Sequence, residues 1–202
     1  MDQDKQPEDV LRFWFGELDA QGMASEAISR RWWTRDDAFD LRVRGEFGET
    51  FQAAMDGRHE AWRDEPRSLL AYVIVLDQFS RNMFRNDPRA FSADPRALEA
   101  ARVGVDAGLD RMLVGVARMF LYMPFEHSED LRMQDRSVAL FTAFRDESTG
   151  PLREQLDYFR TFAIRHRDVV ARWGRFPHRN AVLGRTTSEE EREFLSQPGS
   201  SF

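Results

Sequence analysis

The sequence contains no cysteine, and Lys5 is the single lysine among its 202 residues. Without cysteine, disulfide bonds, thiolate catalysis and cysteine-ligated metal centres are excluded. Lysine nucleophiles and Schiff bases are excluded as well, because Lys5 lies in a polar N-terminal segment. The lack of disulfides fits a cytoplasmic protein, and the acidic start of the chain is unlike a secretory signal.

Further absences concern ligands and membranes. Neither GxGxxG nor GxxxxGK occurs, so there is no glycine-rich phosphate loop and we expect no cofactor. No HExxH or HxxxH spacing joins the histidines, and no metal site is predicted. The longest apolar runs fall short of the roughly 18 residues that span a bilayer, so we expect no membrane partner. A net charge of −6 argues against a nucleic-acid partner, since phosphate binding needs a basic face.

What the sequence does contain is helical periodicity. Hydrophobic residues make up 42% of the chain and recur at helical spacing, whereas no alternating strand pattern occurs. The most apolar segment, 69–79 (LLAYVIVLDQF), predicts a central helix that is buried on every side. We predict one all-α domain over residues 1–202, with about eight to ten helices and frayed tails at 1–6 and 197–202.

Prolines and glycines place several helix boundaries. Pro124 is expected to break one helix, and Ser128 is expected to cap the next. A long helix is predicted from about Leu152 to Trp173, with Gly174 as its stop. The residues after Gly174 should form an irregular segment that packs on the domain.

Polar residues occur where the apolar pattern predicts burial. Asp77 and Arg81, one helical turn apart, continue the face of the most apolar helix, and Gln78 and Arg85 accompany them. His166 interrupts the apolar stripe of the long helix. Because a buried carboxylate must meet donors, these residues form either a structural ion-pair network or one wall of a polar pocket.

Two further segments combine charges with apolar anchors. In 124–130 (PFEHSED), Glu126 and His127 place a carboxylate beside an imidazole, which helix-dipole stabilisation and acid–base chemistry explain equally well. The segment 173–185 (WGRFPHRNAVLGR) holds four candidate ligand contacts, namely Arg175, His178, Arg179 and Asn180. We predict that these segments converge with Asp77 on one cavity, with His166 at its floor and a positive mouth formed by Arg85, Arg175 and Arg179.

Five motifs together resemble a known family. They are VLRFWFGE, RRWWTRDDAFD, LDQFSRNMFRNDPRAFSADPRAL, MPFEHSEDLRMQ and HRDVVARWGRFPHRNAVLGRTTSEEEREFL. They resemble the bacterial domain-of-unknown-function family 924, and the resemblance covers nearly the whole chain. It implies a TPR-like stack of antiparallel helix pairs, and it implies no activity.

Two functions fit these residues. The predicted function is a binding module for a small acidic ligand or a peptide end, lined by Gln78, Arg81, Arg85, Arg175, His178, Arg179 and Asn180. The alternative is a hydrolase or isomerase of small metabolites. Its candidate catalytic groups are the bases His127 and His166 with the carboxylates Glu126 and Asp77.

Overall fold

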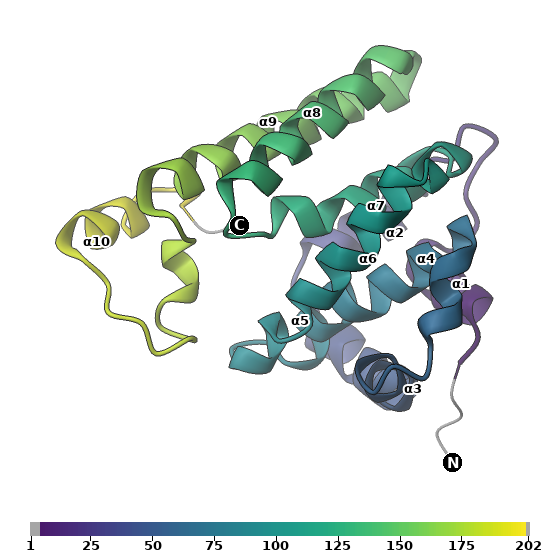
Figure 1. Ribbon diagram of the computed structural model, residues 1–202, viewed down its shortest axis with the longest axis horizontal. Coiled ribbons are helices and arrows are strands. Elements are labelled where there is room, and N and C mark those ends of the chain that lie inside the picture. Colours follow the sequence, from purple (N-terminus) through teal and green to yellow (C-terminus); the bar gives the residue numbers. More distant parts are fainter. Residues whose placement is uncertain (1–4, 201–202) are drawn as a thin grey trace.

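The computed structural model describes residues 5–200, and within that range every regular element is a helix (Figure 1). The predicted all-α class is therefore confirmed. In chain order the elements are α1 (Pro7–Phe15), α2 (Glu26–Trp33), α3 (Asp37–Met55), η1 (Glu60–Asp64), α4 (Pro66–Val73), η2 (Ile74–Phe79), α5 (Ser80–Met83), η3 (Pro88–Phe91), α6 (Asp94–Asp106), η4 (Leu109–Met112), α7 (Val116–Glu126), α8 (Leu131–Glu147), α9 (Gly150–Trp173), η5 (Pro177–Arg179) and α10 (Glu189–Leu195).

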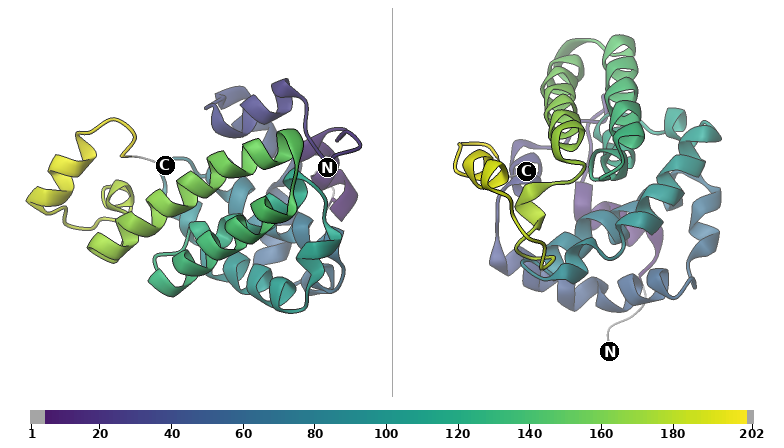
Figure 2. Two further views of the ribbon diagram at one scale, coloured as in Figure 1. Left: turned by 90° about the horizontal axis from the view of Figure 1, so that it is seen from above. Right: turned by 60° about the vertical axis from the view of Figure 1, so that its left-hand side comes forward.

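Two long helices that follow each other in the chain form a hairpin on one side of the molecule. Helices α8 and α9 run side by side, and α7 connects this hairpin to the layer that contains α1 to α6 (Figures 1 and 2). Successive helices pack on one another along this path, with α6 against α7, α7 against α8 and α8 against α9. This order of contacts is compatible with the predicted stack of antiparallel helix pairs.

The core surrounds the central helical segment. Helix α4 continues through η2, a π-helical turn, into α5, and Leu69, Ile74 and Phe79 on this path are at most 1% exposed. Trp14 of α1 packs edge-on against Phe79 and Phe120, with ring centroids 5.7 and 5.5 Å away. The predicted central buried helix is confirmed, and the wide π-helical turn within it is a feature that apolar periodicity did not indicate.

The long C-terminal helix ends where its glycine predicts. Gly174 adopts φ 67°, a left-handed conformation, and its N–H donates to the carbonyl of Val170. The irregular segment that follows contains only the short turn η5 before α10, and its Phe176 side chain is fully buried. Both predictions about this region are confirmed.

Two predicted boundaries are wrong. Helix α7 continues through Pro124 to Glu126, because a proline so close to the helix end removes little of the hydrogen-bond ladder. Helix α8 is capped by Asp130 rather than Ser128. The Asp130 carboxylate accepts from the Arg132 N–H at 2.8 Å, and Ser128 instead accepts from the N–H of Asp130.

The ends of the chain were predicted to be frayed. Residues 1–4 and 201–202 lie outside the described residues. Within the described range, Gln6 and Asp9 form a capping box at the start of α1. Ser200 is 4% exposed and its hydroxyl donates to the carbonyl of Leu195. The described parts of both tails are therefore hydrogen-bonded to the domain.

Candidate functional site

Asp77, on the π-helical turn η2, is fully buried. Its Oδ1 lies 2.7 Å from Nδ1 of His127 and 3.2 Å from Nη1 of Arg81, and its Oδ2 accepts from Gln78 at 2.6 Å. Burial alone would favour the neutral acid. The charge of Arg81 and the contact with His127 outweigh burial and hold the pKa of Asp77 well below its usual range. The prediction of a buried, donor-satisfied carboxylate is confirmed.

This contact assigns the proton on His127. An ionised Asp77 can only accept, so Nδ1 of His127 carries the hydrogen, and burial together with the charge of Arg81 lowers the pKa of the imidazole. In the neutral ring Nε2 is then an unprotonated acceptor. The His127 side chain is 13% exposed, so the imidazole is not fully enclosed. Such a carboxylate-oriented imidazole is the arrangement used by general bases.

A second imidazole–carboxyl pair lies next to the first. His166 Nδ1 is 2.9 Å from the carbonyl of Phe162 and 3.1 Å from Oε1 of Glu126. Burial lowers the pKa of His166 to about 3, while burial and the charge of Asp77 raise the pKa of Glu126 to about 8. At neutral pH both partners are uncharged. Oε2 of the protonated Glu126 has no hydrogen-bond partner among residues 5–200.

Two arginines share the carboxylate of Asp94 at the start of α6. Arg81 holds both oxygens at 2.9 and 3.0 Å, whereas Arg179 makes one contact of 3.4 Å. Arg179 is 6% exposed, and its guanidinium carbon lies 4.7 and 4.6 Å from the ring centres of Phe91 and Phe176. Burial and the charge of Arg81 lower the pKa of Arg179 to about 10, so it remains a cation at neutral pH.

Glu129 holds the irregular segment after Gly174 in place by hydrogen bonds. Its carboxylate accepts two bonds of 2.8 Å from Arg185 and one of 2.8 Å from the N–H of Phe176. His178 lies in the same segment. Burial and the charge of Arg179 lower the pKa of His178 to about 4. We call the whole assembly the polar cluster; it comprises Asp77, Gln78, Arg81, Asp94, Glu126, His127, Glu129, His166, His178, Arg179 and Arg185.

The polar cluster brings together most of the residues that the sequence selected, but three of them lie elsewhere. Arg85 forms two bonds, of 2.7 and 2.9 Å, with Asp40 of α3. Arg175 forms two bonds, of 2.7 and 2.8 Å, with Glu191 of α10, which also accepts from Asn180. The predicted positive mouth is therefore wrong, because Arg85 and Arg175 already have their own carboxylates.

The predicted open cavity is also wrong. His166 is 5% exposed and Asp77 is 0% exposed, so the polar cluster is a closed network. Cavities of about 290 and 310 Å³ occur next to α1 and next to α10, and neither is lined by a residue of the polar cluster. The partly exposed members of the polar cluster include Arg185, Glu129, Arg81, Asp94 and His127, whose side chains are 32, 23, 21, 17 and 13% exposed.

Sequence reasoning missed two contributions to the site. In the sequence, Asp94 precedes a proline, and this pattern indicates only the start of a helix. In the structure, Asp94 is also the shared partner of two arginines. The rings of Phe91 and Phe176, which enclose Arg179, look like ordinary core residues. An acidic residue next to several arginines in one motif (SRNMFRNDPRAFSADPRAL) was the available signal for Asp94.

The described part of the chain offers neither a group of metal ligands nor a membrane-spanning helix. No group of three histidine, aspartate or glutamate side chains there is placed to hold a metal ion. Among residues 5–200, no helix has both the length and the apolar character needed to cross a bilayer.

The fold and the polar cluster define an all-helical protein with a buried network of arginine, histidine and carboxylate side chains. Residues 10–199 match the model of the family described as bacterial protein of unknown function (DUF924), and the chain belongs to this family. It is similar to a solved structure of a protein of unknown function from Agrobacterium tumefaciens, with a TM-score of 0.78 and 33% sequence identity. That match covers 94% of this chain and 96% of the other. No curated protein matches the chain.

Proposed function

We propose that this protein binds a small acidic ligand, a carboxylate or a phosphate, through Arg179 of the polar cluster. The observation that carries the proposal is the incomplete hydrogen bonding of this buried cation. Its Nε has no hydrogen-bond partner among the described residues, and its contact with Asp94 is 3.4 Å long. Buried polar groups are nearly always hydrogen-bonded, and a buried charge is costly unless it is paired.

The surroundings of Arg179 suit an acid. The rings of Phe91 and Phe176 hold the guanidinium and leave its N–H donors at its edge. Asp94 is already bound through both oxygens by Arg81, so a ligand carboxylate or phosphate can take over the donors of Arg179 without leaving Asp94 unpaired. Entry requires a shift of the segment that Glu129 fastens, because Arg179 itself lies on that segment.

A thermal-shift screen with acetate, succinate and inorganic phosphate tests this function, using the wild type, Arg179→Met and Arg132→Met. A ligand present at 100 times its dissociation constant stabilises the folded state by about 2.7 kcal/mol, which moves the melting temperature by several degrees. We expect succinate or phosphate to stabilise the wild type and Arg132→Met, since the Arg132 side chain is 86% exposed and outside the cluster. Arg179→Met should not respond. A wild type that responds to none of the acids would show that the cluster is purely structural.

A second candidate function is acid–base catalysis on such an acid. The specific observation is that a neutral His127, oriented by Asp77, and a protonated Glu126 are neighbours in the sequence. Neighbouring groups whose pKa values are pushed apart in this way divide naturally into a base and an acid. Hydrolysis or isomerisation of a small phosphorylated or carboxylated metabolite is the reaction class that this pair would serve.

NMR-monitored incubation with a panel of such metabolites tests the catalytic candidate. Turnover by the wild type that is lost in His127→Gln and retained in Arg132→Met would support it. Binding without turnover in the wild type would leave the protein a binding module.

A further inference from the structure

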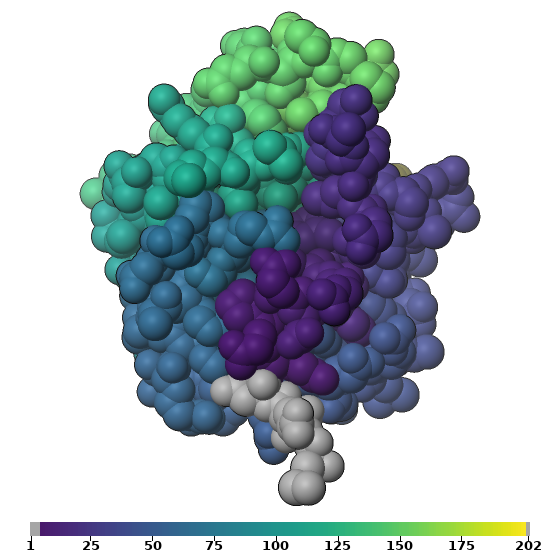
Figure 3. Space-filling view, turned by 90° about the vertical axis from the view of Figure 1, so that its right-hand side faces the viewer, coloured from purple at the N-terminus to yellow at the C-terminus, as the bar shows by residue number. Residues whose placement is uncertain are grey.

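A cavity of about 290 Å³ opens beside α1, on the face shown in Figure 3. Its floor is apolar and belongs to the core, since Leu11, Phe15 and Leu70 are 3, 3 and 1% exposed. Leu18 and Ala117 complete the apolar lining. The volume lies at the lower end of the range of small-ligand pockets, roughly 300–1,000 Å³. No residue of the polar cluster lines this cavity.

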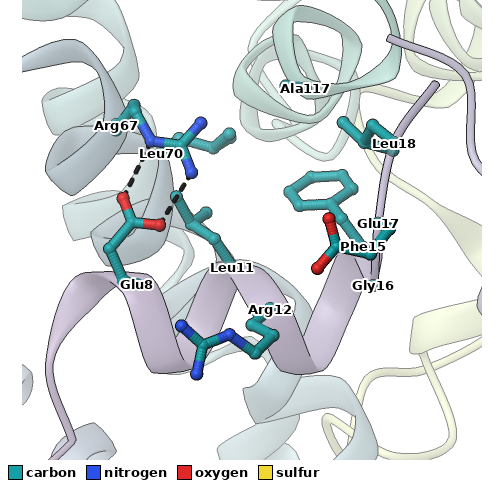
Figure 4. Close-up of a pocket in the computed structure, with 10 residues that line it drawn as sticks. All are labelled: Glu8, Leu11, Arg12, Phe15, Gly16, Glu17, Leu18, Arg67, Leu70 and Ala117. Carbon is teal, nitrogen blue, oxygen red and sulfur yellow. Dashed lines mark hydrogen bonds and ion pairs between the residues drawn. The ribbon is translucent and has the colours of Figure 1, made fainter. Parts of the chain in front are cut away.

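Charged side chains stand on opposite sides of the apolar floor. Figure 4 shows Arg67 on one side of Leu11 and the Glu17 carboxylate on the other, beside the ring of Phe15. Arg67 holds Glu8 through Nε and Nη2, each at 2.8 Å, and its Nη1 makes no hydrogen bond to a residue in the described range. No ion pair joins Glu17 to any residue from 5 to 200, so its carboxylate can receive a cation.

The backbone fixes the position of Glu17. Gly16 ends α1 with φ 60°, a conformation that favours glycine, and its N–H closes the helix on the carbonyl of Arg12 at 2.9 Å. The chain turns there, so that Glu17 and Leu18 line the cavity whose floor α1 itself provides. Arg12 and Arg67 balance Glu8 and Glu17, which leaves the lining with no net charge.

We propose that this cavity binds a short peptide with free ends and apolar side chains, of about dipeptide size. The peptide ammonium pairs with Glu17, its carboxylate accepts from Nη1 of Arg67, and its side chains lie on the apolar floor. A neutral lining with its charges on opposite sides complements a zwitterion, whereas a ligand of one sign would meet like charge as well. An extended dipeptide separates its two ends by roughly 7 Å, so one molecule can reach both sides of a small cavity.

Calorimetric titration with the dipeptide Ala-Leu tests this site, compared with its N-acetylated and its C-amidated forms. We expect Ala-Leu to bind and each blocked form to bind about fivefold more weakly, the effect of one partly solvated ion pair. Glu17→Gln should weaken Ala-Leu by the same factor and leave the N-acetylated form unaffected. Glu8→Gln, which releases Arg67 from its internal partner and removes a negative charge from the lining, should strengthen Ala-Leu binding. Glu26→Gln is the matched control, because the Glu26 side chain is 87% exposed on α2.

Backbone NMR shifts locate the bound peptide. The expected shifts fall in α1, in residues 16–18 and at the start of α4. Three results would overturn the proposal: no binding of Ala-Leu, equal affinity of the blocked forms, or shifts confined to other parts of the molecule. Arg179→Met should bind Ala-Leu like the wild type, so this test and the test of the proposed function can fail separately.

Discussion

The network around Tyr122 and the polar cluster around Asp77 are both buried between helices, and they use their hydrogen-bond donors to different extents. Tyr122 donates to Asp110 at 2.5 Å and accepts from Nε of Arg118 at 2.6 Å. Arg118 also donates to Glu147 at 2.9 Å and stacks 4.4 Å from the ring centre of Phe144. These side chains satisfy one another, which is what a purely structural network requires.

The polar cluster is satisfied only in part. Asp77 accepts from its neighbours through both oxygens, but Oε2 of Glu126 and Nε of Arg179 have no hydrogen-bond partner in residues 5–200. Two buried arginines in one domain therefore differ, because Arg118 donates through both Nε and Nη1, whereas the Nε of Arg179 has no hydrogen-bond partner in residues 5–200. The unused donor of Arg179 is the position at which a ligand could form a hydrogen bond. Mutation of the two arginines tests this difference between the networks.

The largest contrast should appear when each of the two arginines is replaced by methionine. Arg118→Met leaves Asp110, 3% exposed, without its cation and should destabilise the fold by about 3–5 kcal/mol. Arg179→Met removes a buried cation that has one 3.4 Å contact, and Arg81 still holds Asp94. Its free energy of unfolding should stay within about 1 kcal/mol of the wild type. Urea titrations followed by circular dichroism measure both, and equal losses would remove the distinction between the networks.

Asp77→Ala tests the satisfied part of the polar cluster. It leaves Arg81 with the carboxylate of Asp94 and the backbone carbonyl of residue 77, and it deprives His127 of its acceptor, so the free energy of unfolding should fall by about 3 kcal/mol. Asp135→Ala, at an exposed position of α8, is the control and should change stability by less than about 0.5 kcal/mol. If both variants unfold at the same urea concentration, Asp77 does not organise the cluster.

Glu126→Gln tests the proton on the unsatisfied side. The pKa of Glu126 is about 8 in the folded protein and 4.5 as its ordinary value, so the folded state binds more protons between these limits. Stability supplied by the neutral acid is complete below pH 4.5 and is lost as pH rises towards 8. The pKa values of His127, His166 and His178 are lowered from 6.5, so their contribution to the slope fades as pH rises above that value.

Between pH 6.5 and 8 the wild type should therefore lose about 2 kcal/mol that Glu126→Gln retains. Urea denaturation at four pH values in this window, with identical ionic strength, gives the comparison. Parallel pH profiles for the two proteins would mean that Glu126 is ionised in the folded state.

The smallest effect is expected for Tyr122→Phe. Removal of the hydroxyl leaves Arg118 and Asp110 only 3.4 Å apart, so they can pair directly, and the loss should be about 1 kcal/mol. The variant should respond to succinate or phosphate as the wild type does. A changed response to either acid would mean that the network around Tyr122 affects ligand binding at the polar cluster, so the two networks would not be independent.

Features that depend on local sequence could be predicted, and features that depend on distant partners could not. Helix α9 and its stop at Gly174 follow from apolar spacing and one glycine, and the burial of Asp77 follows from the apolar run around it. The sharing of Asp94 by Arg81 and Arg179 joins residues 13 and 85 positions apart, which no spacing rule connects. Arg85 and Arg175 were misassigned for the same reason, since their carboxylates lie on α3 and α10.

The Nε–H resonance of Arg179, assigned by its loss in Arg179→Met, reports most directly on the claim that this cation is available to an acid. Nitrogen–proton NMR spectra recorded during titrations with succinate and with inorganic phosphate would follow it. We predict a saturable shift of this resonance with one of the two acids, while the Nε–H of Arg118 stays in place. An Arg179 resonance that does not move with either acid, while only exposed arginines respond, would contradict the account.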